Sequence, residues 1–296
     1  MFPRAFEYVA PDTLDEALAL LADDPEETRP LAGGHSLLPL MKLRLASPRR
    51  LVDLRRLRAT LGDVRLANGT EGELAIGALT TYQALASHPL LRERHPVVPE
   101  VAAAIGDLQV RNRGTIGGSL AHADPAGDLP AVALALDARL QVAGPGGSTR
   151  AIAAADFFQG AYTTALAPGE LLTQVYVPTP ATRSGAAYAK FKNPASGYAV
   201  VGVAAFLALD SDGRVEMARV GVTGVGEIAY RATACEAALT GQEPSPGRLR
   251  QAAAQAAAGV APLDDLYASG EYRTHLTGVY AERALTGALE RATGAR

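Results

Sequence analysis

Two stretches, Ala32-Gly33-Gly34-His35-Ser36 and Thr115-Ile116-Gly117-Gly118-Ser119, indicate how this chain folds and what it binds. Each follows a short apolar run that we predict to be a strand: residues 30–32 before the first, and the run ending at 115–116 before the second. A glycine pair has no Cβ and can adopt a positive φ, so a ligand can approach successive backbone amides. Amides at such turns bind phosphate. Two turns of this kind predict a ligand with two phosphates.

Neither turn matches the better-known phosphate-binding motifs. The chain contains no Gly-x-x-x-x-Gly-Lys-Ser/Thr sequence, and its first strand-to-helix turn lacks Gly-x-Gly-x-x-Gly. P-loop and Rossmann folds are therefore excluded. Residues 221–226 are rich in glycine, but they leave a predicted strand with the wrong spacing, so we interpret them as a plain loop.

The composition is typical of a globular protein without a strong electrostatic field. It has 296 residues, 48% of them hydrophobic, and a formal net charge of −3. Such a charge predicts no attraction to nucleic acid or to an acidic membrane. The longest apolar run, residues 199–209, is too short to span a bilayer. Because Glu7 and Asp12 interrupt any apolar core at the N-terminus, no signal peptide is predicted, and we expect a cytoplasmic protein without a transmembrane segment.

Cys235 is the single cysteine of the chain. One cysteine excludes an intrachain disulfide, a cysteine-rich zinc site and a cysteine-ligated iron–sulfur cluster within this chain. Its place in a helical pattern predicts a small packed thiol.

The first 55 residues alternate between strand and helix patterns. Strands are predicted at residues 6–9, 30–32 and 51–54. Thr13 and Glu16 form a capping signal for the first helix, and Ser36 is expected to cap a short second helix. The resulting β-α-β-α-β order predicts a small α/β layer.

Residues 56–180 form a second predicted unit. Its strands are expected at residues 74–78, 140–142, 148–152 and 170–178, and its helices at 80–87, 99–105 and 129–136. The Gly-Pro-Gly-Gly turn at 144–147 joins two of the strands as a hairpin. We expect Asp128 to cap the last helix and residues 170–178 to form an edge strand.

A stretch rich in Pro, Thr, Ser and Gly at residues 178–185 marks the predicted domain boundary. Strands follow at residues 187–192, 199–209 and 215–222, and then helices at 232–239, 248–259 and 277–292. The Asp210-Ser211-Asp212-Gly213 turn joins the last two strands. Antiparallel strands followed by helices predict a separate α+β domain.

Polar residues near the glycine turns allow more than one interpretation. His122, Asp124 and Asp128 lie within seven residues, but the two aspartates occupy ordinary turn and cap positions, so no metal is predicted. Because a carboxylate only accepts hydrogen bonds, Asp128 suits a ribose or ring hydroxyl better than a phosphate. Lys190 and Lys192 share one face of a predicted strand. That face is either solvated or presents a cation to an electron-rich cofactor ring.

The two glycine motifs, with residues 111–114 before the second and Asp128 after it, resemble the FAD-binding medium subunit of molybdenum hydroxylases. That family includes aerobic carbon monoxide dehydrogenase, and the flavin domain of xanthine dehydrogenase is related. The resemblance covers essentially the whole chain and implies an α+β fold. Residues 1–180 would form a two-lobed FAD-binding domain of the vanillyl-alcohol-oxidase (PCMH) type, with lobes at about 1–55 and 56–180. Residues 181–296 would form an α+β domain of the carbon monoxide dehydrogenase flavoprotein type, with a three-stranded antiparallel sheet and helices.

The resemblance also implies cofactor contacts. Asp128 would bind the adenosine half of FAD or its ribose, Ile105 and Leu172 would be apolar wall residues, and Lys190, with Lys192 as the alternative, would reach the cofactor. The chain departs from many members at Ser119, where they carry Asn, and in residues 193–197, which lack the arginines common there. The residues whose backbone would hold the FAD pyrophosphate are Pro30, Leu31, Ala32, Gly33, Gly34, His35, Ser36, Leu37, Thr115, Ile116, Gly117, Gly118 and Ser119.

The implied function is that of an electron-transfer flavoprotein subunit with no catalytic residue of its own. A large molybdenum-cofactor subunit would oxidise the substrate, and a small subunit with two [2Fe-2S] clusters would pass electrons to FAD in this chain. NAD or a quinone would be the external acceptor, and the assembly would be a dimer of heterotrimers. Two alternatives stay open: a stand-alone FAD-dependent oxidoreductase of the same fold, and a non-redox nucleotide-binding interaction module.

Overall fold

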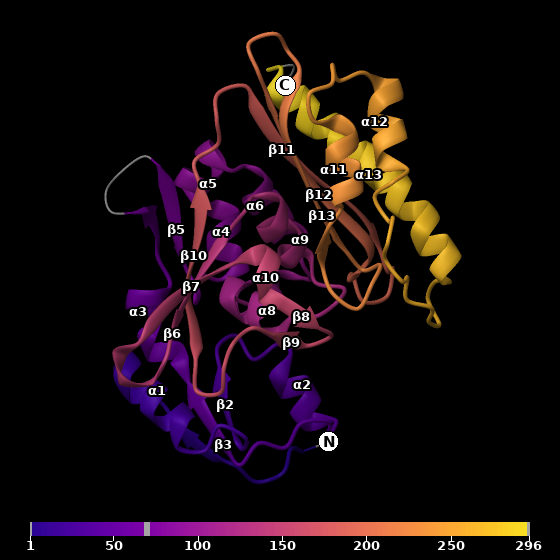
Figure 1. Cartoon of the computed structure of the whole chain (residues 1–296). Coiled ribbons are helices and arrows are strands. Elements are labelled where there is room, and N and C mark those ends of the chain that lie inside the picture. The colour runs from indigo at the N-terminus through magenta and orange to yellow at the C-terminus, as the bar shows by residue number, and fades with distance from the viewer. Residues whose placement is uncertain (1, 68–71, 295–296) are drawn as a thin grey trace.

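Figure 1 shows a computed structural model of the chain, which describes residues 2–67 and 72–294. The N-terminal lobe contains a parallel sheet with the strand order β1-β3-β2. The predicted β-α-β-α-β order is confirmed, with small shifts at the element ends. The elements of this lobe are β1 (Glu7–Val9), α1 (Leu14–Asp23), β2 (Thr28–Leu31), α2 (Leu37–Lys42), β3 (Arg50–Asp53), the 3-10 turn η1 (Leu54–Leu57) and α3 (Arg58–Leu61).

Helix α1 begins where its capping residues predict. The Thr13 hydroxyl accepts a hydrogen bond from the Glu16 amide at 3.2 Å, and the Glu16 carboxylate accepts one from the Asp12 amide at 3.0 Å. These contacts satisfy donors that the first turn of a helix leaves free. Ala17, Leu18 and Leu21 then fall on one face and are buried against the sheet.

The middle of the chain builds an antiparallel sheet with the order β4-β5-β10-β6-β7. We predicted an edge strand at residues 170–178, and this is wrong: β10 pairs with β5 on one side and with β6 on the other. Its partners are distant in sequence, and only its nearly continuous burial signals a central position. The strands are β4 (Val64–Leu66), β5 (Glu73–Gly77), β6 (Arg139–Ala143), β7 (Thr149–Ala153) and β10 (Leu171–Pro178).

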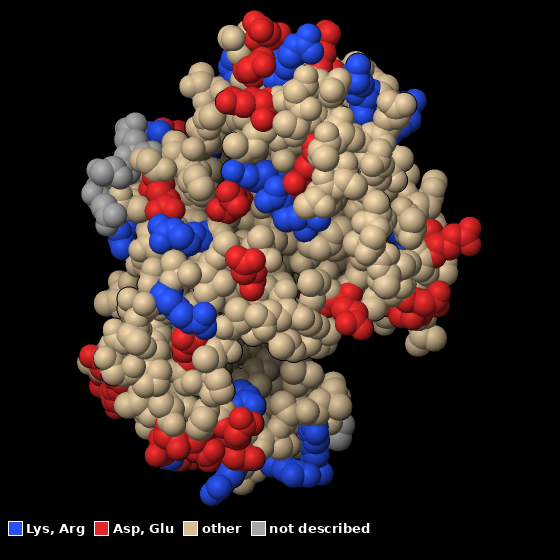
Figure 2. All heavy atoms as spheres, viewed as in Figure 1, with Lys and Arg blue, Asp and Glu red and all other residues tan. Residues whose placement is uncertain are grey.

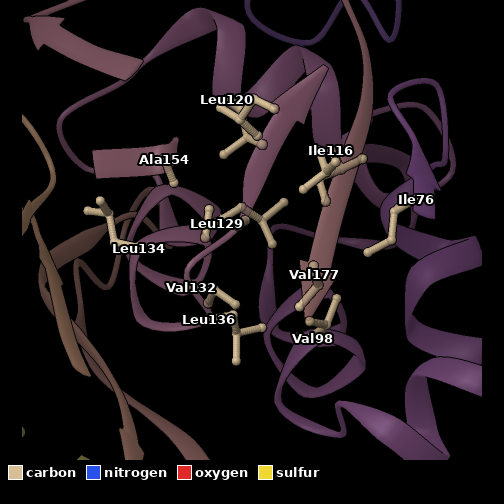
Figure 3. Close-up of a cluster of buried hydrophobic side chains, with 14 of the residues drawn as sticks. Ile76, Val98, Ile116, Leu120, Leu129, Val132, Leu134, Leu136, Ala154 and Val177 are labelled. Atoms are coloured by element: carbon tan, nitrogen blue, oxygen red, sulfur yellow. The ribbon is translucent and has the colours of Figure 1, made fainter. Parts of the chain in front are cut away.

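A layer of helices lies between this sheet and the C-terminal sheet (Figure 1). Ile116, Leu120 and Leu129 of this layer meet Ile76 and Val177 of the sheet in one buried cluster (Figure 3). The elements of the layer are α4 (Tyr82–Ser87), α5 (Pro89–Arg94), α6 (Val97–Ala104), α7 (Leu108–Arg111), α8 (Ile116–His122), α9 (Asp128–Ala135) and α10 (Ala154–Phe157), followed by the hairpin of β8 (Phe158–Gly160) and β9 (Thr163–Thr164).

The second glycine motif does not follow a strand, contrary to our prediction. The run before it forms α7, and Gly117 and Gly118 lie in the first turn of α8. Thr115 is the N-cap of α8. Asp128 was expected to cap α9, but Gly127 is its N-cap and Asp128 is its first residue. The Asp128 carboxylate is free to bond outside the helix for that reason.

The C-terminal part contains an antiparallel sheet with the order β11-β12-β13-β14. The strands predicted there are confirmed, and the two-residue β14 adds to the edge. β12 is buried along its whole length, because its odd-numbered residues from Val201 face α13 while Ala204, Phe206 and Ala208 join the helical layer. The elements are β11 (Ser184–Lys192), β12 (Ala199–Leu209), β13 (Val215–Thr223), β14 (Tyr230–Arg231), α11 (Thr233–Leu239), α12 (Pro246–Ala253) and α13 (Gly270–Ala292).

Cys235 lies on α11 with its side chain fully buried in the C-terminal core, as predicted. Burial raises the pKa of its thiol to about 12, so the group stays protonated and unreactive near neutral pH. Within residues 2–67 and 72–294, no helix combines the length and apolar character that crossing a membrane requires.

Candidate functional site

The two glycine motifs meet in the folded chain. A Cβ atom on Gly33 would overlap the backbone carbonyl of Arg113, just before the second motif. A Cβ atom on Gly118 would lie 4.0 Å from the Cβ of Ala32 in the first. Because position 33 is glycine, the two motifs can pack closely against each other. A side chain at this position would push them apart.

The first bend leaves its backbone amides available. Within the described part of the chain, the amides of Gly33, Gly34, His35 and Ser36 have no hydrogen-bond acceptor. Gly34 has a φ of 78°, and the His35 ring lies back on the Gly33 carbonyl at 3.1 Å. Successive free amides at a turn form a concave donor surface that suits an anion.

The second bend differs from expectation, because its amides already donate within the chain. The Gly117 amide bonds to the Ala78 carbonyl at 2.8 Å, the Gly118 amide to the Thr115 hydroxyl at 3.1 Å and the Ser119 amide to the Thr115 carbonyl at 3.0 Å. A Cβ atom on Gly117 would lie 2.7 Å from the Ala78 carbonyl oxygen. The second bend therefore supplies a closely packed helix start rather than a row of free donors.

Both bends line a cavity of about 520 Å³, a volume within the usual range for ligand pockets. Figure 2 shows a hollow between the N-terminal lobe and the rest of the molecule. Ile105, Ile116, Asp128 and Lys190 are not part of its lining. The predicted contact residues that line the cavity are Pro30, Leu31, Ala32, Gly33, Gly34, His35, Ser36, Leu37, Thr115, Gly117, Gly118, Ser119 and Leu172.

Several lining residues were not predicted to contact the cofactor. Tyr82 comes from α4; burial raises the pKa of its phenol to about 12, and a hydrogen bond with Ser119 opposes that shift. His122 closes α8, with its ring 5.1 Å from that of Tyr162. Burial lowers the pKa of His122, and the charge of Asp124 opposes the shift. The lining thus adds aromatic surface to the amide donors.

Asp128, Tyr188 and Lys190 form a buried polar cluster behind the cavity wall. The Asp128 carboxylate accepts hydrogen bonds from the Tyr188 hydroxyl at 2.5 Å and from Lys190 Nζ at 2.9 Å. The side chains of Asp128 and Lys190 are only 6% and 8% exposed. Burial raises the pKa of Asp128, while Lys190 and Tyr188 counteract the shift. Both carboxylate oxygens already have partners, so the ribose contact of Asp128 stays a prediction.

The other predicted contact residues lie apart from the lining. Ile105 ends α6 and packs against the central core, and Ile116 is buried in that core. Lys190 also donates to the Gly197 carbonyl at 3.1 Å, whereas Lys192 is exposed after an irregularity in the pairing of β11. The two lysines therefore lie in different surroundings, although strand alternation predicted one shared face.

A second, smaller cavity of about 230 Å³ lies where residues 124–126 meet the C-terminal part. Arg273 of α13 lines it and is 4% exposed. Its guanidinium donates to the carbonyls of Val200 and Gly224 and to the Asp265 carboxylate. Arg273 therefore joins α13 to the ends of β12 and β13, although its Nε has no hydrogen-bond partner among the described residues.

Within the described residues, no group of three or more His, Cys, Asp or Glu side chains could hold a metal ion. The large cavity instead combines free amide donors, small residues and aromatic rings. Its floor of glycines admits a ligand close to the backbone, and its donors suit a diphosphate. These features fit the pyrophosphate and rings of a dinucleotide such as FAD.

Comparison with known proteins agrees with this geometry. A family model described as the FAD-binding domain in molybdopterin dehydrogenase matches residues 4–180. A second, described as the CO dehydrogenase flavoprotein C-terminal domain, matches residues 186–288. The chain therefore belongs to the FAD-binding subunits of molybdopterin dehydrogenases, which are FAD-dependent oxidoreductase subunits. The predicted family, fold class and cofactor, FAD, are confirmed.

Individual relatives show how similar the chain is to known members of this family. The chain is 41% identical over 292 residues to the carbon monoxide dehydrogenase medium chain of Afipia carboxidovorans, covering 99% of each. It is 34% identical to the glyceraldehyde dehydrogenase medium chain of Sulfolobus acidocaldarius, covering 96% of this chain and 98% of that one. A solved structure of carbon monoxide dehydrogenase from Hydrogenophaga pseudoflava has a chain with a TM-score of 0.93 and 40% identity, covering 98% of this chain and 99% of that one.

Proposed function

We propose that this chain is the electron-transfer flavoprotein subunit of a molybdenum hydroxylase and that FAD lies in the large cavity. The observation that carries the proposal is the row of amides at Gly33, Gly34, His35 and Ser36, which have no acceptor within the described residues and line that cavity. A pyrophosphate supplies the missing acceptors without a cation. The second bend then forms the floor against which the diphosphate rests.

The remaining predicted contacts complete the site in this proposal. Leu172 and Tyr82 bound the cavity with apolar and aromatic surface. The Asp128–Lys190 pair lies behind the wall, close enough that the Asp128 charge contributes to the raised pKa of Tyr82. Ile105, at the end of α6, would extend the apolar wall, and Lys190 rather than Lys192 would supply the buried cation. Residues 1–180 and 181–296 would be the two domains, as the spans of the family models support.

Electron flow in this proposal depends on partner chains. With its one cysteine buried, this chain offers no set of cysteine ligands for an iron–sulfur cluster, and in this proposal a small subunit with two [2Fe-2S] clusters delivers the electrons. FAD accepts two electrons, one at a time, together with two protons, and can release them singly or as a pair. NAD or a quinone would take them, and a large molybdenum-cofactor subunit would be their source. A dimer of heterotrimers is the assembly we expect.

Substitution of Ser36 tests the diphosphate site without disturbing the fold. Ser36 is the N-cap of α2 and makes no side-chain capping bond, and both Asp and Asn are favourable at that position. Ser36→Asp places a carboxylate beside the proposed pyrophosphate, and like charges in contact cost several kcal/mol, so FAD affinity should fall roughly a hundredfold. Ser36→Asn keeps the shape without the charge and should retain FAD.

The measurement is FAD content per purified chain and the dissociation constant from flavin fluorescence. If the Asp and Asn variants bound FAD equally well, with unchanged circular dichroism, the pyrophosphate would not bind at this bend. Purification with a cysteine-rich iron–sulfur chain separates the electron-transfer subunit from a stand-alone flavoenzyme. If the purified protein were colourless and never bound FAD, the remaining alternative would be a non-redox nucleotide-binding interaction module.

A further inference from the structure

The second glycine bend has to bind an anion with groups other than its amides. The amides of Gly117, Gly118 and Ser119 already donate within the chain. The Thr115 hydroxyl is buried and accepts the hydrogen bond of the Gly118 amide. Side-chain hydroxyls are the other neutral donors that a cavity wall can offer. At this bend they come from Ser119 on α8 and from Tyr82 on α4, which both line the large cavity.

The Tyr82 side chain is held in place by the backbone of the second motif. Its amide donates to the Gly114 carbonyl at 2.9 Å, and the preceding residue, Thr81, pairs with Thr115 as an isolated β-bridge. A Cβ atom on Gly114 would overlap the Tyr82 ring, so glycine at this position allows the ring to lie against the backbone. The phenol is therefore fixed before a ligand arrives, and little conformational entropy is lost when it forms a contact.

Tyr82 also lies close to the first bend, with one residue between them. A Cβ atom on Gly33 would lie 2.9 Å from the Gly114 Cα, and the Tyr82 ring lies against Gly114 as well. The free amides of residues 33–36 and the Tyr82 phenol therefore border the same part of the cavity. The two phosphates of a diphosphate share one oxygen. A ligand with one phosphate on the free amides thus brings its other phosphate toward the second bend.

The Tyr82 hydroxyl has a proton to donate. Its hydrogen bond with Ser119 lowers the pKa of Tyr82, which is the effect of a donor to the phenolic oxygen, so Ser119 donates and Tyr82 accepts. Within residues 2–67 and 72–294, the phenolic proton itself has no acceptor. Burial raises the pKa of Tyr82 to about 12, and the charges of Tyr198 and Asp128 add to that rise. The phenol therefore remains a donor at neutral pH.

We propose that the Tyr82 hydroxyl, supported by Ser119, donates a hydrogen bond to the diphosphate of FAD at the second bend, where the amides are already in use. This inference rests on the proposed function, since it requires FAD in the large cavity. The resemblance assigns the backbone of the second motif to the pyrophosphate, whereas here the contact is made by two hydroxyls. A hydrogen bond to a charged phosphate contributes more to binding than one between neutral groups.

The test uses the full chain and measures the dissociation constants of FAD and of ADP, which carries the diphosphate without the flavin ring. Tyr82→Phe removes the hydroxyl and keeps the ring, so we expect it to weaken the binding of both ligands roughly tenfold. Because Ser119 acts through Tyr82, adding Ser119→Ala to Tyr82→Phe should weaken binding by less than the product of the two separate factors.

The matched control is Tyr230→Phe. The Tyr230 hydroxyl donates to the Ala256 carbonyl at 3.1 Å in the C-terminal part, away from the cavity lining. This variant also loses a hydrogen bond of a largely buried phenol, but it should bind FAD and ADP as the unaltered chain does. Phosphorus-31 NMR of bound FAD adds a direct measurement: Tyr82→Phe should shift a phosphate signal, and Tyr230→Phe should shift none.

Three results would overturn the hydroxyl contact and leave the FAD proposal intact. The first is equal FAD affinity of Tyr82→Phe and the unaltered chain, and the second is a phosphorus spectrum that Tyr82→Phe leaves unchanged. The third is weaker binding of FAD with unchanged binding of ADP, which would assign Tyr82 to the flavin half of the cofactor. Absence of FAD from the unaltered chain would overturn the proposed function itself.

Discussion

Individual buried polar residues in this protein are specified by partners far away in the sequence. Tyr188 reaches Asp128 because position 202 on the neighbouring strand is glycine: a Cβ atom there would overlap the Tyr188 hydroxyl. With Lys190 on its other oxygen, the Asp128 carboxylate has charge-assisted hydrogen bonds that offset the cost of burial. Burial raises the pKa of Tyr188 well above its ordinary value, so its hydroxyl remains the donor at any physiological pH.

His95 provides a pH-dependent contribution to stability. Its side chain is 4% exposed, and its Nε2 has no partner within the described residues. Burial lowers its pKa to about 4, opposed by a hydrogen bond with the Pro178 backbone. The unfolded chain, in which the pKa is about 6.5, then binds the proton more readily. The contribution is therefore complete above pH 6.5 and is lost as the pH falls toward 4, by about 3 kcal/mol in total.

The check is the free energy of unfolding in urea between pH 8 and pH 4 for the unaltered chain and for His95→Gln. The variant should lose less stability over that range, because it has no proton to bind at this position. His275→Gln, at an exposed histidine of α13, should follow the unaltered chain. Parallel pH curves for His95→Gln and the unaltered chain would contradict the assignment.

At the scale of elements, close approach between helix and strand accounts for the second glycine motif. The first turn of α8 lies directly against residue 78, where β5 ends, and the Gly117 amide bonds to the Ala78 carbonyl. A methyl group at position 117 would lie 2.5 Å from the Ala78 Cβ, so α8 would have to move. Gly117→Ala should therefore destabilise the chain by about 1–3 kcal/mol, as expected for overpacking, and weaken FAD binding.

The matched control is Gly247→Ala. Gly247 is also the second residue of a helix, α12, but a Cβ atom there meets nothing within 4 Å. Because alanine is a better helix former than glycine, this variant should be neutral or slightly more stable. Thermal unfolding and flavin fluorescence of the two variants give the comparison. Equal stability of Gly117→Ala and Gly247→Ala would show that α8 has room to move.

The elements that were predictable from sequence are those with local signals. Residues 13–16 predicted the N-terminal cap of α1, and the turn from Asp210 to Gly213 predicted the hairpin of β12 and β13. β10 was placed at an edge because strand order depends on β5 and β6, which no local pattern identifies. The run before Gly117 was expected to be a strand because it is a short apolar stretch, yet Leu108–Arg111 and Ile116–His122 are helical. Both glycine bends line the large cavity, but the use of each amide depends on contacts with residues 78 and 115, which no local pattern identifies.

At the scale of the whole molecule, the central helical layer fastens the C-terminal sheet to the rest. The Thr223 hydroxyl donates to the carbonyls of Pro125 and Gly127, and the Gly224 amide donates to the Pro125 carbonyl. Arg291 at the end of α13 pairs with Glu100 of α6. β12 contributes side chains to two cores at once. Because these contacts and β12 connect the two cores, we predict that the unaltered chain unfolds in a single cooperative transition.

Gly221 is the position at which that coupling can be weakened. It lies on β13, where a Cβ atom would overlap the Ala131 carbonyl of α9 and approach the Leu134 Cβ to 3.1 Å. Gly221→Ala should therefore separate α9 from the sheet while leaving the C-terminal core, formed with α11, α12 and α13, able to fold. Calorimetry should show two transitions, and flavin release should accompany only one of them. Met217→Ala, at a half-exposed residue on the same strand, should keep the single transition. One transition in Gly221→Ala, shifted no further than in Met217→Ala, would mean that the two cores are coupled through α13 and Glu100 instead.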